Sequence, residues 1–192
     1  MKKIATTGLM ACAFLFGTIA CNQQTDSVEE AQETTEERFE DTAMEDERED
    51  AAEFMTKSAS SNMMAIEASK LAQQKATNPQ VKEFANMMVN DHTALGKEMR
   101  ELATSKNITM PDSMSNDHMD HVRELNEKTG ADFDKAYMDR MVSVHENDVD
   151  RFEDVAEDNN YDDAEVKAMA SKTLSKIRQH HERAKQIKDA LK

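Results

Sequence analysis

Three histidines lie where the helical pattern of the chain predicts an apolar side chain. His92 and His180 each interrupt a series of apolar residues spaced alternately four and three apart, and His145 lies on a similar face of another stretch. Imidazole nitrogens that gather inside a helical protein suit Zn or Cu. This spacing indicates a candidate metal site, to which nearby carboxylates could add oxygen ligands. Its candidate residues are His92, His145, His180, Glu67, Asp91 and Asp148.

The same histidines have a second interpretation that needs no metal. Each imidazole can hydrogen-bond a neighbouring Asp or Glu, because buried polar groups need partners. If the chain turns near Asn160, His145 and His180 differ by about four residues, or roughly 6 Å along the helices. A turn near Asn78 places His92 opposite Met64. This axial mismatch is awkward for one metal ion and favours the hydrogen-bonded interpretation.

A second group of possible ligands lies in a short polar stretch. His118 and His121 are three residues apart and share one face of a helix, with Met119 between them. Imidazole and thioether ligands suit Cu(II) and Cu(I). Methionine-rich patches also serve as adaptable packing, so both a copper site and plain packing are open here.

Composition restricts the fold and the partners. The chain has 192 residues, enough for one domain with appendages, and it contains only four Gly and two Pro. A many-stranded sheet or barrel needs more turn residues, which leaves an all-helical protein. The formal net charge of −15 repels the phosphate backbone of nucleic acids, so DNA and RNA are excluded as partners.

The start of the chain predicts export and anchoring. Two lysines are followed by an uncharged stretch over 4–20, which ends in Ala20 and Cys21. This layout resembles a bacterial lipoprotein signal, in which the cysteine is lipidated and becomes the N-terminus. Cleavage before Cys12 would leave a shorter apolar run, so we predict that residues 1–21 are the signal and that Cys21 is the membrane anchor. Asn22 favours the outer membrane over the inner one.

Beyond the signal, the sequence divides into a tether and a helical domain. Residues 22–53 contain fourteen acidic and two basic side chains, a charge density that predicts a disordered acidic spacer. Residues 54–192 have helical periodicity and form the predicted domain. Four long helices are expected over 54–76, 79–106, 132–158 and 162–191, the last beginning at a capping Asp162. A short helix over 115–128 crosses between the second and third. This pattern predicts a four-helix bundle.

The domain also resembles a known family. Residues 81–92 (with the series Phe-Ala-x-x-Met-Val-x-Asp-His), 130–138 (with Phe-Asp-x-x-Tyr-Met), 145–146 and 174–180 are similar to bacterial predicted outer-membrane proteins of unknown function. The resemblance implies a ferritin-like four-helix bundle and a place in the cell envelope, and it implies no activity. Ala65 stands where the family commonly has Glu, which removes a carboxylate from the expected core.

Catalysis has little support in the sequence. Ferritin-like di-iron sites use Glu-x-x-His pairs, but Val89 and Ile177 occupy the positions three before His92 and His180. Motifs for nucleophilic or phosphate chemistry are also missing, which favours a non-enzymatic protein.

These features predict an envelope lipoprotein that presents its helical bundle as a non-catalytic binding or structural module. The membrane is its partner through Cys21, and an unidentified protein or small molecule is its ligand. No cofactor is assigned by this first hypothesis. The alternative is a metal-binding protein that stores or buffers Cu, Zn or Fe through the bundle histidines.

Overall fold

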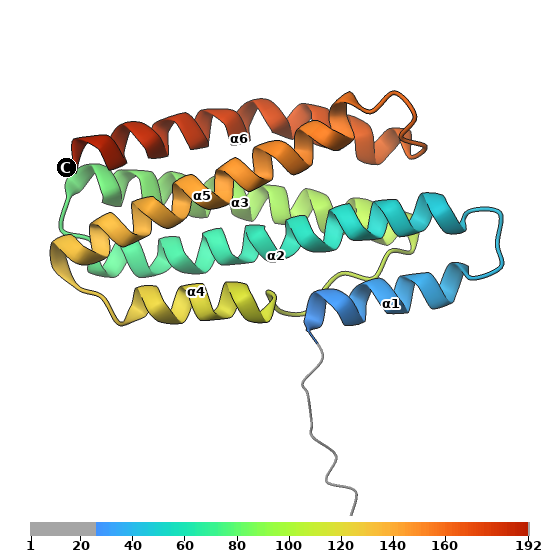
Figure 1. Ribbon diagram of the computed structural model, residues 1–192, viewed down its shortest axis with the longest axis horizontal. Coiled ribbons are helices and arrows are strands. Elements are labelled where there is room, and N and C mark those ends of the chain that lie inside the picture. The colour runs from blue at the N-terminus through green and yellow to red at the C-terminus, as the bar shows by residue number, and fades with distance from the viewer. Residues whose placement is uncertain (1–25, 192) are drawn as a thin grey trace, which may run out of the picture.

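The computed structural model describes residues 26–191, and within this range the chain is all-helical, as the sequence predicts. Figure 1 shows the helices lying lengthwise beside one another. The helices are α1 (Ser27–Phe39), α2 (Glu45–Lys75), α3 (Pro79–Lys106), α4 (Asn116–Asn126), α5 (Gly130–Glu157) and α6 (Ala164–Ala190).

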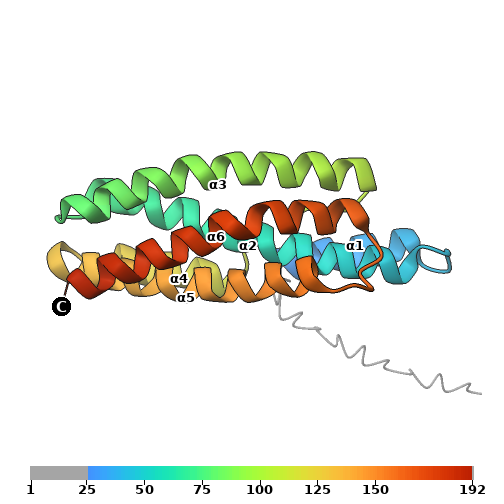
Figure 2. The same ribbon diagram turned by 90° about the horizontal axis from the view of Figure 1, so that it is seen from above.

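The four long helices enclose the interior, and the two short ones lie outside α2. α2 contacts α3 and α5, while α6 contacts the other sides of α3 and α5. α1 and α4 both pack on α2 and follow each other along it (Figures 1 and 2). The connection after α3 therefore returns along the molecule, as predicted.

Local sequence signals explain most helix ends. Asn78 caps α3 with its side-chain oxygen and Pro79 occupies the first turn, where its missing N–H is not needed. α6 is capped by Asp163 and not by the predicted Asp162. The Asp163 carboxylate accepts two backbone N–H groups of the first turn, each at 3.1 Å. Gly130, the first residue of α5, has φ +59°, a conformation that suits glycine.

A polar layer crosses the interior and separates two apolar clusters. One cluster contains Met64, Met88, Val144 and Ala184, and the other contains Ala59, Met99, Phe152 and Ile177. On every long helix, buried polar residues occupy the positions between these clusters. They are Ser61, Asn62, His92, His145, Asp148 and His180. Helical continuity thus places all three core histidines at one level.

The predicted disordered tether is wrong over the residues that the structure describes. Within 26–53, α1 buries Val28, Ala31 and Thr35, which are spaced three and four apart and form a narrow stripe of one helix face. Gln32 donates to the Thr56 hydroxyl at 2.9 Å, and Thr35 accepts the backbone N–H of Thr109 at 2.9 Å. Small side chains and polar contacts hold this helix, although its exposed face is highly acidic.

The domain boundary predicted at residue 54 also shifts. α2 begins at Glu45, and both Ala51 and Ala52 are buried in its N-terminal part. These alanines allow close approach to the neighbouring helices, while acidic residues remain on the solvent side. The predicted signal over 1–21, including Cys12 and Cys21, lies outside the described residues.

Over residues 26–191, none of the helices combines the length and the apolar character needed to cross a bilayer. The helices are amphipathic instead, each with a charged outer face.

Candidate metal centre

The polar layer brings three histidines from three helices into one group. His92 comes from α3, His145 from α5 and His180 from α6, and all three are buried. One ligand nitrogen from each lies within 4.8 Å of the other two. Within residues 26–191, this is the group of His, Cys, Asp and Glu side chains that has the proximity a metal ion requires.

The closest pair already has the separation of two zinc ligands. His92 Nε2 and His145 Nε2 are 3.3 Å apart. Two nitrogens bound tetrahedrally at about 2.0–2.1 Å from Zn²⁺ are about 3.3–3.4 Å from each other. The His180 ring lies 5.5 Å from both other rings, centroid to centroid. This ring supplies the third nitrogen of the set.

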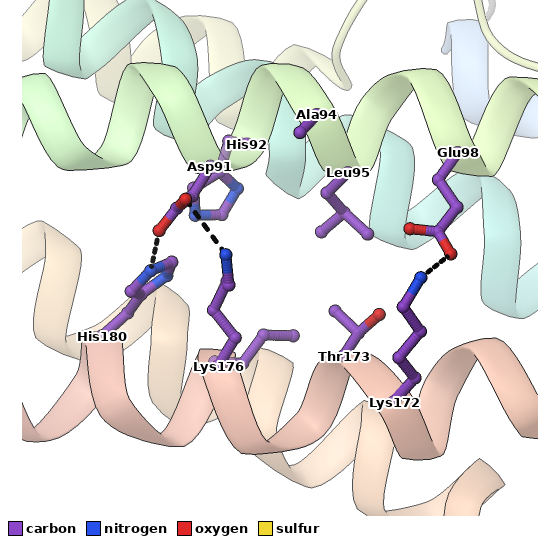
Figure 3. Close-up of a pocket in the computed structure, with 10 residues that line it drawn as sticks. Asp91, His92, Ala94, Leu95, Glu98, Lys172, Thr173, Lys176 and His180 are labelled. Atoms are coloured by element: carbon purple, nitrogen blue, oxygen red, sulfur yellow. Dashed lines mark hydrogen bonds and ion pairs between the residues drawn. The ribbon is translucent and has the colours of Figure 1, made fainter.

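In each histidine, one ring nitrogen lies next to a neighbouring acceptor, and this contact holds the ring in place. We call this atom the outer nitrogen. His145 Nδ1 donates to the Met141 carbonyl at 2.8 Å. His180 Nε2 donates to the Asp91 carboxylate at 2.9 Å, as Figure 3 shows. His92 Nδ1 is 3.0 Å from Asn62 Oδ1. An acceptor on one ring nitrogen fixes the tautomer and leaves the lone pair on the other, which is the usual support of a metal-binding histidine.

The free nitrogens are inside the protein and lack conventional partners. His180 Nδ1 is buried and makes no hydrogen bond within the described structure. His92 Nε2 and His145 Nε2 face each other, and with their outer nitrogens protonated both carry lone pairs. A cation or a proton between these nitrogens removes the repulsion. Buried polar atoms that lack partners are uncommon, so these three nitrogens form a candidate ligand set.

Burial keeps all three rings neutral. It lowers the pKa of His145 from 6.5 to about 4 and the pKa of His92 well below 6.5, with the other histidines adding to the latter shift. Burial also lowers the pKa of His180, although the hydrogen bond to Asp91 opposes it. Neutral imidazole is the metal-binding form, so the rings are ready to coordinate at neutral pH.

The axial mismatch expected between His145 and His180 does not keep their rings apart. Side chains lean toward the N-terminus of their own helix. Because α5 and α6 run in opposite directions, His145 leans away from the connection between them and His180 leans toward it. His180 is the more distant from that connection, and the two inclinations bring the rings together.

The three candidate carboxylates have different surroundings. Asp91 supports the site, because it accepts from His180 and also from Lys176, at 3.1 Å. Those two hydrogen bonds outweigh the effect of burial and lower the pKa of Asp91. Asp148 lies in the polar layer but pairs with Ser61 and Arg151, at 2.7 and 2.5 Å.

Glu67 lies away from the histidine group. It forms an exposed ion pair with Lys70 at 2.6 Å. Its position on the flank of α2, rather than on the core face, accounts for this placement.

The second group of predicted ligands has other partners. His118 Nδ1 pairs with the Ser60 hydroxyl at 2.7 Å, and His121 Nε2 is 3.0 Å from the Arg140 guanidinium. Their rings are 6.1 Å apart, and Met119 is 38% exposed. An arginine that occupies one imidazole nitrogen is a poor neighbour for a cation, so α4 offers hydrogen bonds and packing here.

Two residues that the sequence did not single out complete the surroundings of the histidines. Asn62 from α2 contacts His92, so all four long helices contribute to the layer. Gly96 on α3 makes room for it, since a Cβ at this position would lie 2.7 Å from Asn62 Nδ2. In the sequence, the polar Asn62 on an otherwise buried helix face was the signal that could have indicated this role.

Comparison with known proteins identifies a family. No curated protein matches the chain. No solved structure matches it either. A family model matches residues 29–187, a range that starts within α1 and ends within α6. The matched range holds all three core histidines and Asn62, together with most of the acidic segment. The chain therefore belongs to the family described as Domain of unknown function (DUF4142).

Proposed function

We propose that this protein binds one divalent transition-metal ion, Zn²⁺ or Cu²⁺, through His92 Nε2, His145 Nε2 and His180 Nδ1. The observation that carries the proposal is the orientation of the three rings. Each ring has its outer nitrogen next to a protein acceptor. The other nitrogens lie in the buried layer, where those of His92 and His145 face each other and that of His180 makes no hydrogen bond. Zn²⁺ and Cu²⁺ are the metals that such nitrogen ligands favour.

The proposed role is metal binding, storage or buffering, with no reaction assigned. The four long helices form a ferritin-like four-helix bundle in this proposal, with α1 and α4 as additions on α2. A di-iron centre is not proposed, because the layer contains imidazoles and lacks the bridging glutamates of such sites. The apolar clusters on both sides hold the helices, and the metal adds to a fold that already has a core.

Isothermal titration of metal-stripped protein tests the proposal. Cys12 and Cys21 are replaced by serine so that thiolates do not compete for the metal. We expect one Zn²⁺ or Cu²⁺ site per chain. His145→Gln is expected to lower its affinity more than about a hundredfold, because loss of a ligand exceeds the 10–100-fold cost of losing a supporting contact.

A histidine outside the layer provides the matched control. His118→Gln changes a partly buried histidine on α4 and is expected to leave the titration unchanged. The competing arrangement is a neutral hydrogen bond between His92 and His145, with the Asn62 amide reversed. In that case the wild type shows no site tighter than micromolar, or a site that survives His145→Gln.

We also propose that the protein is a lipoprotein of the bacterial outer membrane, anchored through Cys21. The proposal rests on the run of uncharged residues before Ala20 and Cys21. The mass of membrane-extracted protein should show a lipid-modified N-terminal cysteine, and Cys21→Ser should release the protein from the membrane. Unmodified, soluble wild type contradicts the anchor and leaves the metal proposal untouched.

A further inference from the structure

A cavity between α3 and α6 reaches the histidine layer. It has a volume of about 240 Å³, and its walls include His92 and His180, two of the three proposed metal ligands. Leu95 and Thr173 face each other across it, and Asp91 and Lys176 lie at its histidine end (Figure 3). The volume exceeds the roughly 30 Å³ that one water molecule occupies in the liquid. A small ligand therefore has room next to two of the proposed ligand residues.

The charges around the layer require a negative ligand. Three neutral imidazoles leave the full charge of a divalent cation in a buried place. The two nearby carboxylates are already balanced, Asp91 by Lys176 at 3.1 Å and Asp148 by Arg151 at 2.5 Å. A buried charge is stable only when it is paired. Neither of these two carboxylates is therefore available to balance the charge of the metal.

We infer that the cavity between α3 and α6 holds an exchangeable fourth ligand of the metal, and that this ligand is a small anion. The inference rests on the proposed metal site. Hydroxide from water and a small external anion share the required chemistry, a compact negative donor atom. The apolar side of the cavity, with Leu95 and Ile177, limits the size of the anion.

The test uses the cysteine-free protein loaded with Co²⁺, whose visible spectrum reports the coordination of the metal, and azide as the probe anion. We expect azide to change the spectrum and to saturate. Leu95→Phe adds bulk to a cavity wall and is expected to weaken azide binding at least about tenfold. Its Co²⁺ content should equal that of the wild type.

Leu102→Phe is the matched control. Leu102 is also partly buried on α3, but it is not part of the cavity wall. Azide binding to this variant should match the wild type. Ala94→Phe is a second blocking variant at an exposed cavity residue, should Leu95→Phe disturb the fold. A spectrum that changes with rising pH in anion-free buffer identifies hydroxide as a source of the ligand.

The outcomes separate this inference from the proposed function. Failure to bind Zn²⁺, Cu²⁺ and Co²⁺ overturns both. Co²⁺ binding through the histidines with a spectrum that azide and pH leave unchanged overturns the fourth ligand alone. Equal weakening of azide binding in Leu95→Phe and Leu102→Phe also overturns it, because the anion would then not occupy this cavity.

Discussion

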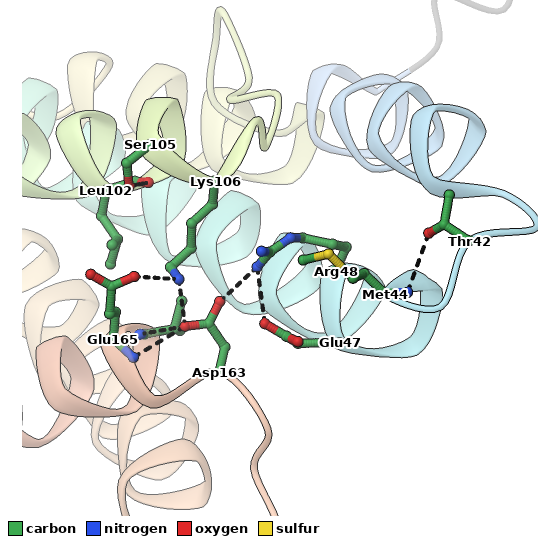
Figure 4. A network of polar contacts seen from close by, with 10 residues as sticks. Thr42, Met44, Glu47, Arg48, Leu102, Ser105, Lys106, Asp163 and Glu165 are labelled. Atoms are coloured by element: carbon green, nitrogen blue, oxygen red, sulfur yellow. Dashed lines mark hydrogen bonds and ion pairs between the residues drawn. The ribbon is translucent and has the colours of Figure 1, made fainter.

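The histidine layer and the ion-pair cluster at the start of α6 are both buried polar groups, but they differ in how their atoms are satisfied. In the cluster, the Asp163 carboxylate receives Lys106 and Arg48, each at 2.8 Å, and Glu165 also pairs with Lys106 at 2.8 Å (Figure 4). Arg48 also pairs with Glu47 at 3.2 Å, so both cations of the cluster lie between carboxylates. The same carboxylate caps α6, so this cluster ties together the ends of α2, α3 and α6.

The histidine layer has the opposite character. Its outer contacts are complete, but nitrogens on the inside face each other or have no hydrogen bond. No charge pairs with them directly. The difference shows how a structural cluster and a ligand site can be distinguished: the first pairs its buried charges with charges of opposite sign, and the second holds its donors in place and leaves their inner nitrogens for a ligand.

Removing the shared carboxylate is expected to give the largest loss of stability. Asp163→Ala leaves Arg48 and Lys106 with only the more exposed carboxylates of Glu47 and Glu165, and it removes the cap of α6. Breaking a buried pair in this way costs about 3–5 kcal/mol of unfolding free energy. Urea denaturation measures the loss, and Asp162→Ala, at the exposed neighbouring position, is the control. A loss below about 1 kcal/mol for Asp163→Ala contradicts the structural role.

Acid should affect the two regions in different pH ranges. The folded-state pKa of His145 is about 4 and the ordinary value is 6.5. The unfolded chain therefore takes up a proton first, so the metal-free protein loses stability as pH falls from 6.5 to 4, by about 3 kcal/mol. Hydrogen bonds from Lys106 and the α6 backbone outweigh burial and lower the Asp163 pKa below 3.8. The stability that the Asp163 carboxylate contributes is present above pH 3.8 and is lost only at lower pH.

Urea midpoints measured across this range test the prediction. His145→Gln should flatten the slope between pH 6.5 and 4 and keep the loss at lower pH. Asp163→Asn, which can still cap the helix, should keep the upper slope. Equal slopes in wild type and His145→Gln above pH 4 show that this ring does not stay neutral in the folded protein.

Metal binding should stabilise the folded protein, and it should do so only through the histidine layer. At a hundredfold excess of Zn²⁺ over the dissociation constant, binding to the folded state adds about 2.7 kcal/mol. Thermal melts should show this gain in the wild type and in Asp162→Ala, and lose it in His180→Gln. A gain that persists in His180→Gln places the metal elsewhere, for example on the acidic surface.

Several features of this comparison could be predicted from sequence. The helical class, the limits of α3 and the histidines on apolar faces follow from periodicity and capping residues. Metal binding through His92, His145 and His180 stays a prediction until it is measured. The meeting of the rings depends on the direction in which side chains lean, which a count of residues along the helices omits.

The acidic segment shows why the rest was difficult to predict. Net charge and the scarcity of large apolar residues predict disorder, yet α1 buries a stripe of Val28, Ala31 and Thr35. The spacing of three and four between these residues is visible in the sequence, but the stripe is too narrow and too polar to predict a packed helix. Arg48 was counted as tether charge, whereas its partner Asp163 lies 115 positions away. Such long-range pairing has no local signal in the sequence.

The smallest expected effect on stability concerns Gly96, which separates the support of the histidines from the strength of the fold. Alanine favours a helix by up to about 1 kcal/mol over glycine. However, its Cβ would lie 2.7 Å from Asn62 Nδ2, so the Asn62 amide must shift away from His92. We expect Gly96→Ala to change the unfolding free energy by less than about 1 kcal/mol, and to weaken Zn²⁺ binding about tenfold through the loosened His92 ring.

A double-mutant cycle with Asn62→Ala tests this explanation. Asn62→Ala alone should weaken Zn²⁺ binding to a similar extent, because it removes the acceptor of His92 Nδ1. Once that side chain is gone, the added Cβ has nothing to displace, so Gly96→Ala should have no further effect on the affinity. Additive losses would contradict the proposed path from Gly96 through Asn62 to His92, because residues that act through one contact do not add. Titration calorimetry of the four proteins distinguishes the two results.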